Sequence, residues 1–194
     1  MGVPMLSIPK QINGGMFVLN VENMLHHTKS PKIIVSIVNP SKDNTGKNQF
    51  EKAFLDVKEA FTLVRNIRNV NQADPKQVLV SYKGGVDKKR DNMLVSRILR
   101  FERNMEKKTI VITLSVSEGE QDYTVNKYGE QVKGVVKPKR GGTQLGRVSI
   151  SLTRDEALYV ADMIDKELSA WRVAINCDVF FHPDKYAQPQ QANV

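Results

Sequence analysis

Basic side chains gather in two segments of this 194-residue chain, where they could bind a polyanion. From residue 76 to residue 108, ten Lys or Arg stand against four acidic residues, a balance of +6. From residue 127 to residue 147, six stand against Glu130 alone, a balance of +5. The formal charge of the whole chain is only +8, so the remainder is slightly acidic. A positive field concentrated in this way favours a phosphate backbone as partner, because each neutralised phosphate releases condensed counterions.

Aromatic residues stand beside these cations: Tyr82 precedes Lys83, Phe101 follows Arg100, and Tyr123 and Tyr128 lie near Lys127. Unpaired bases stack on flat side chains while cations hold the phosphates, so the combination predicts binding of single-stranded nucleic acid. The candidate binding residues are Tyr82, Lys83, Lys88, Lys89, Arg90, Arg97, Arg100, Phe101, Arg103, Lys108, Tyr123, Tyr128, Lys137, Lys139, Arg140 and Arg147. The alternative for any single aromatic residue is a place in the core of a sheet.

Catalytic and metal-binding patterns are weak by comparison. His26 and His27 are adjacent, and His182 stands near the single cysteine, Cys177, so no zinc-ligand spacing is present. A Gly-Lys pair at residues 46–47 lacks the first glycine and the hydroxyl residue of a phosphate-binding P-loop. We therefore expect a protein that is not an enzyme and that holds neither a metal nor a cofactor.

Nothing in the sequence indicates a membrane protein. No window approaches the roughly 18 apolar residues of a membrane span, and the first residues lack the basic start and apolar stretch of a secretory signal. One cysteine leaves no disulfide within the chain, which is typical of a reducing compartment. The expectation is a soluble protein of the cytoplasm, in a bacterium or a phage-infected host cell.

Runs rich in branched and aromatic residues predict strands. They are residues 16–21, 33–38, 78–82, 93–101, 110–116 and 148–152. In 110–116 the apolar residues alternate with Val111, Thr113 and Ser115, so one face can pack on a core and the other can meet solvent or a ligand. Arg147, Ser149 and Ser151 alternate with apolar residues in the same way.

Two segments have the period of amphipathic helices, residues 56–69 and 154–172. Asp56 with Glu59, and Thr153 with Glu156, form capping boxes at their starts. The two starts align at an offset of 97 residues, half the chain, which predicts strands followed by a helix, twice. Coincidence of ordinary strand-to-helix chemistry is the alternative. Between the last two predicted strands of the second half, residues 117–146 are expected to form a long, flexible, basic loop, with a short strand at 123–125.

This order resembles the Whirly family of single-stranded DNA-binding proteins, most sharply in residues 109–116 followed by 147–157. Positive-cofactor-four coactivators and some phage single-strand binding proteins are similar. The resemblance implies an α+β fold of two units, each of four strands and one helix, with antiparallel sheets and packed helices. It also implies binding of unpaired strands on the sheets, and homo-oligomers, dimers or tetramers, formed through the helices. Residues 1–184 would make one domain, with repeats at about 1–72 and 76–172, and 185–194 a disordered tail.

The leading hypothesis is a protein that coats single-stranded DNA with little sequence specificity, in replication, recombination or repair. RNA binding or transcription control is an alternative, since no residue pattern reports on a 2′-hydroxyl. An interaction module whose basic loop binds an acidic protein is another. An enzyme acting on nucleic acid would need a carboxylate cluster for metal, which the sequence does not assemble.

Overall fold

A computed structural model of the chain describes residues 3–12, 15–26, 30–42, 48–69, 77–88 and 90–182. Lys89, His27, and the tail predicted to be disordered at 185–194 lie outside these ranges. The first half forms the antiparallel sheet A from β1 (Val3–Ile12), β2 (Gly15–Asn23), β3 (Lys32–Lys42) and β4 (Asn48–Asp56), in that order. Helix α1 (Val57–Arg68) follows directly. Strand β1 was not predicted because Pro4 and Pro9 interrupt it, and an edge strand tolerates proline.

The second half repeats this arrangement with one extra strand. Strands β5 (Gln77–Asp87), β6 (Met93–Asn104), β7 (Thr109–Val125) and β9 (Gln144–Leu152) form the antiparallel sheet B, in that order. The last part of β7 leaves this sheet and pairs with β8 (Gln131–Pro138) to form the β7–β8 hairpin. The predicted loop at 117–146 is therefore wrong, and so is the count of four strands in this half. Val132, Val135 and Val136 supply the branched residues of β8, and Gly129 has the positive φ of 82° that closes the turn.

Both helices begin where the sequence predicts. Asp56 Oδ1 accepts a hydrogen bond from Glu59 N at 2.8 Å, and Thr153 Oγ1 accepts one from Glu156 N at 3.3 Å, so both capping boxes are confirmed. Helix α2 (Arg154–Phe181) continues past the predicted end at 172, because no glycine or proline interrupts it before Pro183. None of the helices in the described residues is long and apolar enough to cross a membrane.

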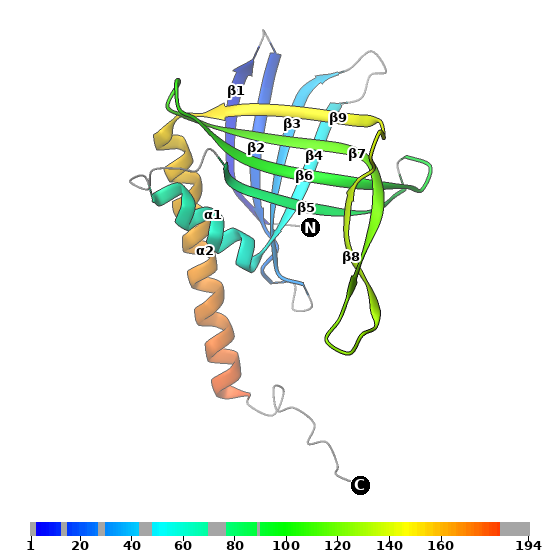
Figure 1. Ribbon diagram of the computed structural model, residues 1–194. Helices are drawn as coiled ribbons and strands as arrows, with labels where there is room; N and C mark the ends of the chain where they lie inside the picture. Colours follow the sequence, from blue (N-terminus) through cyan, green and yellow to red (C-terminus); the bar gives the residue numbers. More distant parts are fainter. Residues whose placement is uncertain are drawn as a thin grey trace.

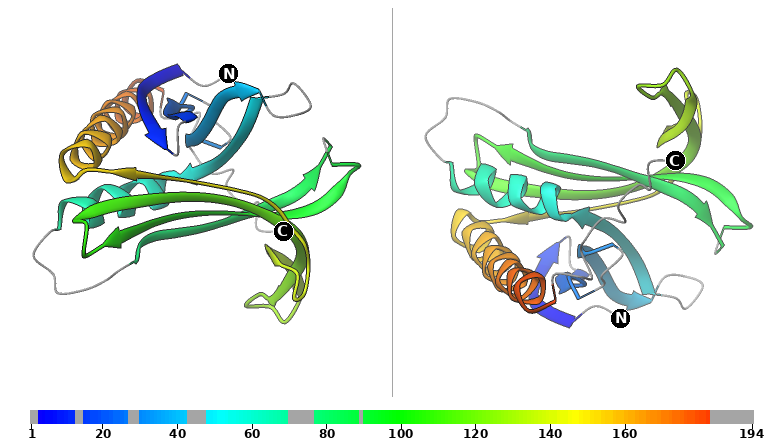
Figure 2. Two further views of the ribbon diagram at one scale, coloured as in Figure 1. Left: turned by 90° about the horizontal axis from the view of Figure 1, so that it is seen from above. Right: turned by 90° about the horizontal axis from the view of Figure 1, so that it is seen from below.

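The two sheets face each other as two layers, and the two helices pack together at one end of them (Figures 1 and 2). Arg68 of α1 pairs with Asp162 and Asp165 of α2 at 2.6 and 2.8 Å. One apolar core draws on both halves, and its fully buried side chains include Leu19, Ile37, Leu55, Leu63, Leu99, Phe101, Ile112, Ile150 and Ile164. The expected α+β fold of duplicated strands-then-helix units, with antiparallel sheets and packed helices, is confirmed.

Candidate nucleic-acid interface

The outer face of sheet B is the side of β5, β6, β7 and β9 that points away from sheet A. On β6, Leu99 and Phe101 point into the core, so Arg100 between them points outward. Figure 1 looks onto this face, with sheet A behind it, and neither helix of the described chain lies across it. No described helix therefore covers this face.

Strand register places two rows of side chains across the middle of the outer face. One row runs across the sheet through Val80, Arg100, Thr113 and Ser149, and the other through Tyr82, Ile98, Ser115 and Arg147. Residues directly opposite in antiparallel strands share a face, and diagonal neighbours lie about 7–8 Å apart. Tyr82 is therefore a diagonal neighbour of Arg100, and Arg147 stands at the far edge of the second row.

These side chains are available to a ligand. Tyr82 is 40% exposed, Arg147 is exposed and Arg100 is half-buried. Within the described residues, neither Arg100 nor Arg147 makes a hydrogen bond or an ion pair. A guanidinium without a protein partner can donate to a phosphate in bidentate fashion, so the outer face holds one stacking ring and two cations that can bind phosphate.

Three other predicted cations lie on the inner side of sheet B or in the turn between β5 and β6, and each is paired. Lys83 Nζ lies 2.9 Å from Glu59 and 3.3 Å from Asp56. Burial opposes its charge, but the hydrogen bond and field of these carboxylates outweigh burial and raise the pKa of Lys83. The other two are Arg90, 2.9 Å from Glu51 and 2.8 Å from Asp87, and Arg97, 2.6 Å from Asp87. Lys83 and Arg90 tie sheet B to β4 and α1, and Arg97 ties β6 to β5, so we assign these pairs to structure.

Arg103 and Phe101 are also engaged in the fold. Arg103 Nη2 donates to the carbonyls of Asn66 and Asn69 at 2.7 and 3.1 Å, which satisfies the C-terminal end of α1. Phe101 is only 1% exposed and packs in the core. The expectation that its ring stacks on a base is corrected, because the pleat directs it away from the outer face.

The β7–β8 hairpin curls away from sheet A and stands beside the outer face (Figure 2). Val136 of β8 holds the hairpin against sheet B. This residue is only 6% exposed, and its backbone carbonyl accepts a hydrogen bond from Ser96 Oγ of β6 at 2.9 Å. The docking requires glycine beneath it, because a Cβ at Gly84 or Gly119 would lie 2.5 Å from the Val136 side chain.

The hairpin and its connection to β9 carry most of the remaining predicted residues. Tyr123 and Tyr128 are exposed, and Lys127 Nζ lies 4.9 Å from the centre of the Tyr128 ring. Lys137 is exposed but pairs with Asp122 at 2.6 Å. Lys139 and Arg140 are exposed on the connection. The residues named in this paragraph form a basic surface beside the sheet. We call this surface the hairpin wall; it consists of Tyr123, Lys127, Tyr128, Lys137, Lys139 and Arg140.

Lys88 and Lys108 are exposed in the turns at opposite ends of β6. Lys88 precedes β6 at the hairpin end of the sheet, and Lys108 follows it with a positive φ of 50°. They can contribute to the field around the face, but the rows do not include them.

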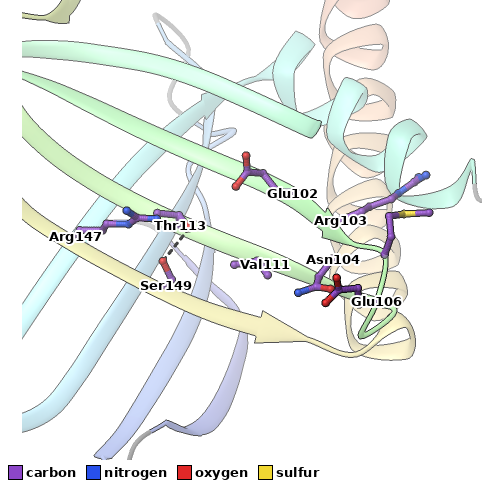
Figure 3. A pocket seen from close by; sticks show the side chains of 9 residues that line it. Glu102, Arg103, Asn104, Glu106, Val111, Thr113, Arg147 and Ser149 are labelled. Atoms are coloured by element: carbon purple, nitrogen blue, oxygen red, sulfur yellow. Dashed lines mark hydrogen bonds between the residues drawn. The ribbon is translucent and has the colours of Figure 1, made fainter. Parts of the chain in front are cut away.

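A hollow of about 530 Å³ lies on the outer face beside the β6–β7 turn (Figure 3). Val111, Thr113 and Ser149 form its floor, and Thr113 Oγ1 lies 2.8 Å from Ser149 Oγ. Its other lining residues are Glu102, Arg103, Asn104, Met105, Glu106 and Arg147.

The binding residues predicted from the sequence did not include the small polar side chains of this face, Thr113, Ser115 and Ser149. The alternation in β7 and β9 could have identified them. The predicted residues also omitted Phe54 on the outward side of sheet A, whose ring centre lies 5.6 Å from both Lys32 Nζ and Lys52 Nζ. The predicted strand runs did not include the residues of β4, so no alternation placed Phe54 on a face. Among the described residues, no group of three or more His, Cys, Asp or Glu could hold a metal ion.

Comparison with known proteins gives a structural likeness and no likeness in sequence. No family model matches the sequence, and no curated protein matches it. The chain is similar to the crystal structure of WHY1 from Arabidopsis thaliana, with 13% sequence identity and a TM-score of 0.48. The likeness covers 94% of this chain and 95% of that one.

Proposed function

We propose that this chain binds single-stranded nucleic acid across the outer face of sheet B, and that it coats unpaired DNA with little sequence specificity during replication, recombination or repair in the cytoplasm. The observation that carries the proposal is the placement of Tyr82, Arg100 and Arg147 on one open face, without protein partners for the two guanidiniums in the described residues. These are the parts that single-strand binding needs, rings for bases and cations for phosphates.

The strand would cross sheet B along its rows. A base stacks on Tyr82, while Arg100 and Arg147 donate hydrogen bonds to neighbouring phosphates. The hairpin wall flanks this path, and its ammonium and guanidinium groups raise the local concentration of polyanion. Stacking and ion pairing need no cofactor and no catalytic group, so the proposal is a binding function.

A sheet face with one stacking ring suits an unpaired strand better than a duplex. Base pairs in a duplex present only their edges, and reading them takes a helix or ribbon that enters the major groove. Both described helices lie at the end of the sandwich, away from the outer face (Figure 1). The bases that stack on Tyr82 must therefore be unpaired.

Fluorescence polarisation tests the proposal with a labelled oligothymidine of about 30 nucleotides, the matching duplex and an RNA of equal length. We expect the single strand to bind more tightly than the duplex, with an affinity that falls steeply as salt rises. Equal weak binding to all three would reduce the basic segments to a general positive field. Absence of binding at low salt would refute the proposal and favour an acidic protein as partner.

RNA is the second candidate ligand within the same chemistry. None of the outer-face residues named above distinguishes a ribose from a deoxyribose by its type alone. Preferential binding of the RNA arm would therefore move the proposal from DNA coating to RNA binding or transcription control without changing the site.

We also propose that the chain forms a homo-oligomer through α2. The end of α2 extends beyond the two sheets (Figure 1), and Val173, Phe180 and Phe181 on it are exposed, Phe180 by 78%. Apolar side chains on a projecting helix are typical of a protein interface. Light scattering after size exclusion should report a dimer or tetramer, and F180E should shift it toward the monomer.

A further inference from the structure

The hollow on the outer face differs in chemistry from the rest of the path that we propose for the bound strand. It lies at the end of the row formed by Arg100, Thr113 and Ser149, where the β6–β7 turn rises beside the sheet (Figure 3). Its volume of about 530 Å³ falls in the range of sites that hold small molecules. A single nucleotide unit of a strand crossing the sheet can therefore enter it.

Three of the side chains with donors around the hollow already have partners. Thr113 and Ser149 bond to each other across the floor. The Arg103 guanidinium donates to carbonyls at the end of α1 and points away from the hollow in Figure 3. Glu102 and Glu106, by contrast, make no hydrogen bond or ion pair within the described residues. The charged groups of the lining without a partner are thus these two carboxylates and the Arg147 guanidinium, which the proposed function assigns to a phosphate.

Glu102 and Glu106 repel a phosphate on their own side of the hollow. Arg147 lines the hollow from β9, and Arg100 is the next outward-facing residue of β6 after Glu102, so these two cations can hold phosphates. A strand that keeps its phosphates on these cations presents a base, not its backbone, to the hollow. The base that enters meets acceptors and must supply a donor.

We infer that the hollow takes one base of the bound strand and that Glu102 accepts a hydrogen bond from its exocyclic amino group. The inference rests on the proposed function and adds a bias to it: cytosine, adenine and guanine are favoured there over thymine and uracil. A carboxylate accepts well from the amino group of cytosine, whereas uracil places a carbonyl oxygen at the same position. The carboxylate and this carbonyl oxygen are both acceptors and cannot hydrogen-bond to each other. Both stay unsatisfied, which disfavours uracil at this position.

Glu102 is the residue expected to discriminate, because β6 fixes its position. It lies opposite Val111 of β7 and is half-buried, so its carboxylate is held at the edge of the floor. Glu106 is exposed on the β6–β7 turn and is free to turn toward solvent. Glu106→Gln is therefore the matched control, with the same change of charge on the same hollow.

The test compares oligodeoxycytidine with oligodeoxyuridine of about 12 nucleotides, within the range of such binding sites, by fluorescence polarisation at pH 7.5. The unmodified protein should bind the cytidine strand about 5- to 100-fold more tightly, the discrimination of one good base contact. Glu102→Gln should bring the two dissociation constants to within about twofold, because an amide can accept or donate. Glu106→Gln should keep the ratio of the unmodified protein.

The ratio in the unmodified protein alone can overturn the inference, so it does not depend on the variants folding. Equal binding of both strands, or tighter binding of uridine, would refute the bias while leaving the proposed function intact. Retention of the ratio by Glu102→Gln would refute the role of Glu102. Absence of salt-dependent binding to either strand would refute the proposed function itself, and the inference with it.

Discussion

Arg100 and Phe101 are neighbours in β6, yet they point to opposite faces of sheet B. Phe101 lies opposite Ile112 in the core, whereas Arg100 lies opposite Thr113 on the outer face. Tyr82 and Lys83 divide in the same way on β5, with the ring outward and the ammonium paired to Glu59. An aromatic residue next to a cation in a strand therefore does not share a surface with it, and only one member of each pair can meet a ligand.

The first prediction concerns the two unpaired guanidiniums of the outer face. Arg100→Ala and Arg147→Ala should each weaken binding to all single strands and reduce the slope of log K against log salt by about 0.7, the loss of one phosphate contact. A salt titration by fluorescence polarisation measures the slope. Lys58→Ala removes one exposed charge from α1, away from the face, and should leave the slope unchanged.

Stacking on Tyr82 gives the second prediction. Tyr82→Ala should weaken binding by about 5- to 100-fold, because a stacked base contributes roughly 1–3 kcal/mol. Tyr82→Phe keeps the ring and should bind within about twofold of the unmodified protein. If both substitutions weaken binding equally, the hydroxyl and not the ring makes the contact, and stacking on Tyr82 is refuted.

The paired cations of the inner side should behave differently. Arg97→Met removes a hydrogen bond to Asp87, a carboxylate that is almost fully buried. We expect the free energy of unfolding, measured in urea, to fall by about 1–3 kcal/mol. Affinity for single strands per folded molecule should not change. Lys166→Met, at an exposed position on α2, is the control for loss of one charge. A large loss of affinity in Arg97→Met would place Arg97 in the binding site instead.

The cap of α1 predicts a dependence of stability on pH. Burial opposes the charge of Asp56, but the N–H of Glu59 and the ammonium of Lys83 outweigh burial and lower the pKa of this carboxyl from its ordinary value of 3.8. A pKa that is lower in the folded state stabilises the fold above pH 3.8 and loses that contribution as the pH falls through the folded value.

Asp56→Asn isolates this contribution, because asparagine still caps a helix but carries no charge. The melting temperature of the variant should lie below that of the unmodified protein at pH 7, and the two should converge as the pH drops below 3.8. Thermal melts followed by circular dichroism from pH 7 to about pH 3 measure the difference. A difference that stays constant over this range would contradict the pairing with Lys83.

Docking of the hairpin wall depends on Gly84. An alanine Cβ there would lie 2.5 Å from the Val136 side chain and 2.6 Å from the Val95 carbonyl oxygen, so the hairpin must shift away from β5. Gly84→Ala should speed hydrogen exchange in β8, as read by mass spectrometry. Gly134→Ala is the control, since its Cβ would meet nothing closer than 3.4 Å. Unchanged exchange in both variants would show that Val136 does not hold the hairpin.

The sequence predicted what depends on local chemistry. Both capping boxes were visible because four residues in a row determine each of them, as at Asp56 and Thr153. The two faces of β7 followed from strict alternation, which placed Thr113 outward. The order of strands and helices followed from the repeat of these signals at half the chain.

Features that depend on distant pairing could not be predicted. The basic segment at 131–138 looks like a loop until β7 offers it a partner along its full length. Whether a cation is free or paired depends on which carboxylate the fold brings to it, as Glu59 is brought to Lys83 and Asp87 to Arg97. These partners lie on other elements. The sequence therefore identified the cations, but only the structure shows which of them are paired and which are free.

Photo-crosslinking tests the central claim most directly, because it reports where the strand lies. An oligothymidine that carries 5-iododeoxyuridine is bound at low salt, irradiated and digested with the protein, and mass spectrometry identifies the modified residues. If the strand lies on the outer face of sheet B, the adducts should be on Tyr82, or on Tyr123 and Tyr128 of the hairpin. Adducts confined to sheet A, at Phe54 between Lys32 and Lys52, would contradict the claim and move the interface to the opposite face of the molecule.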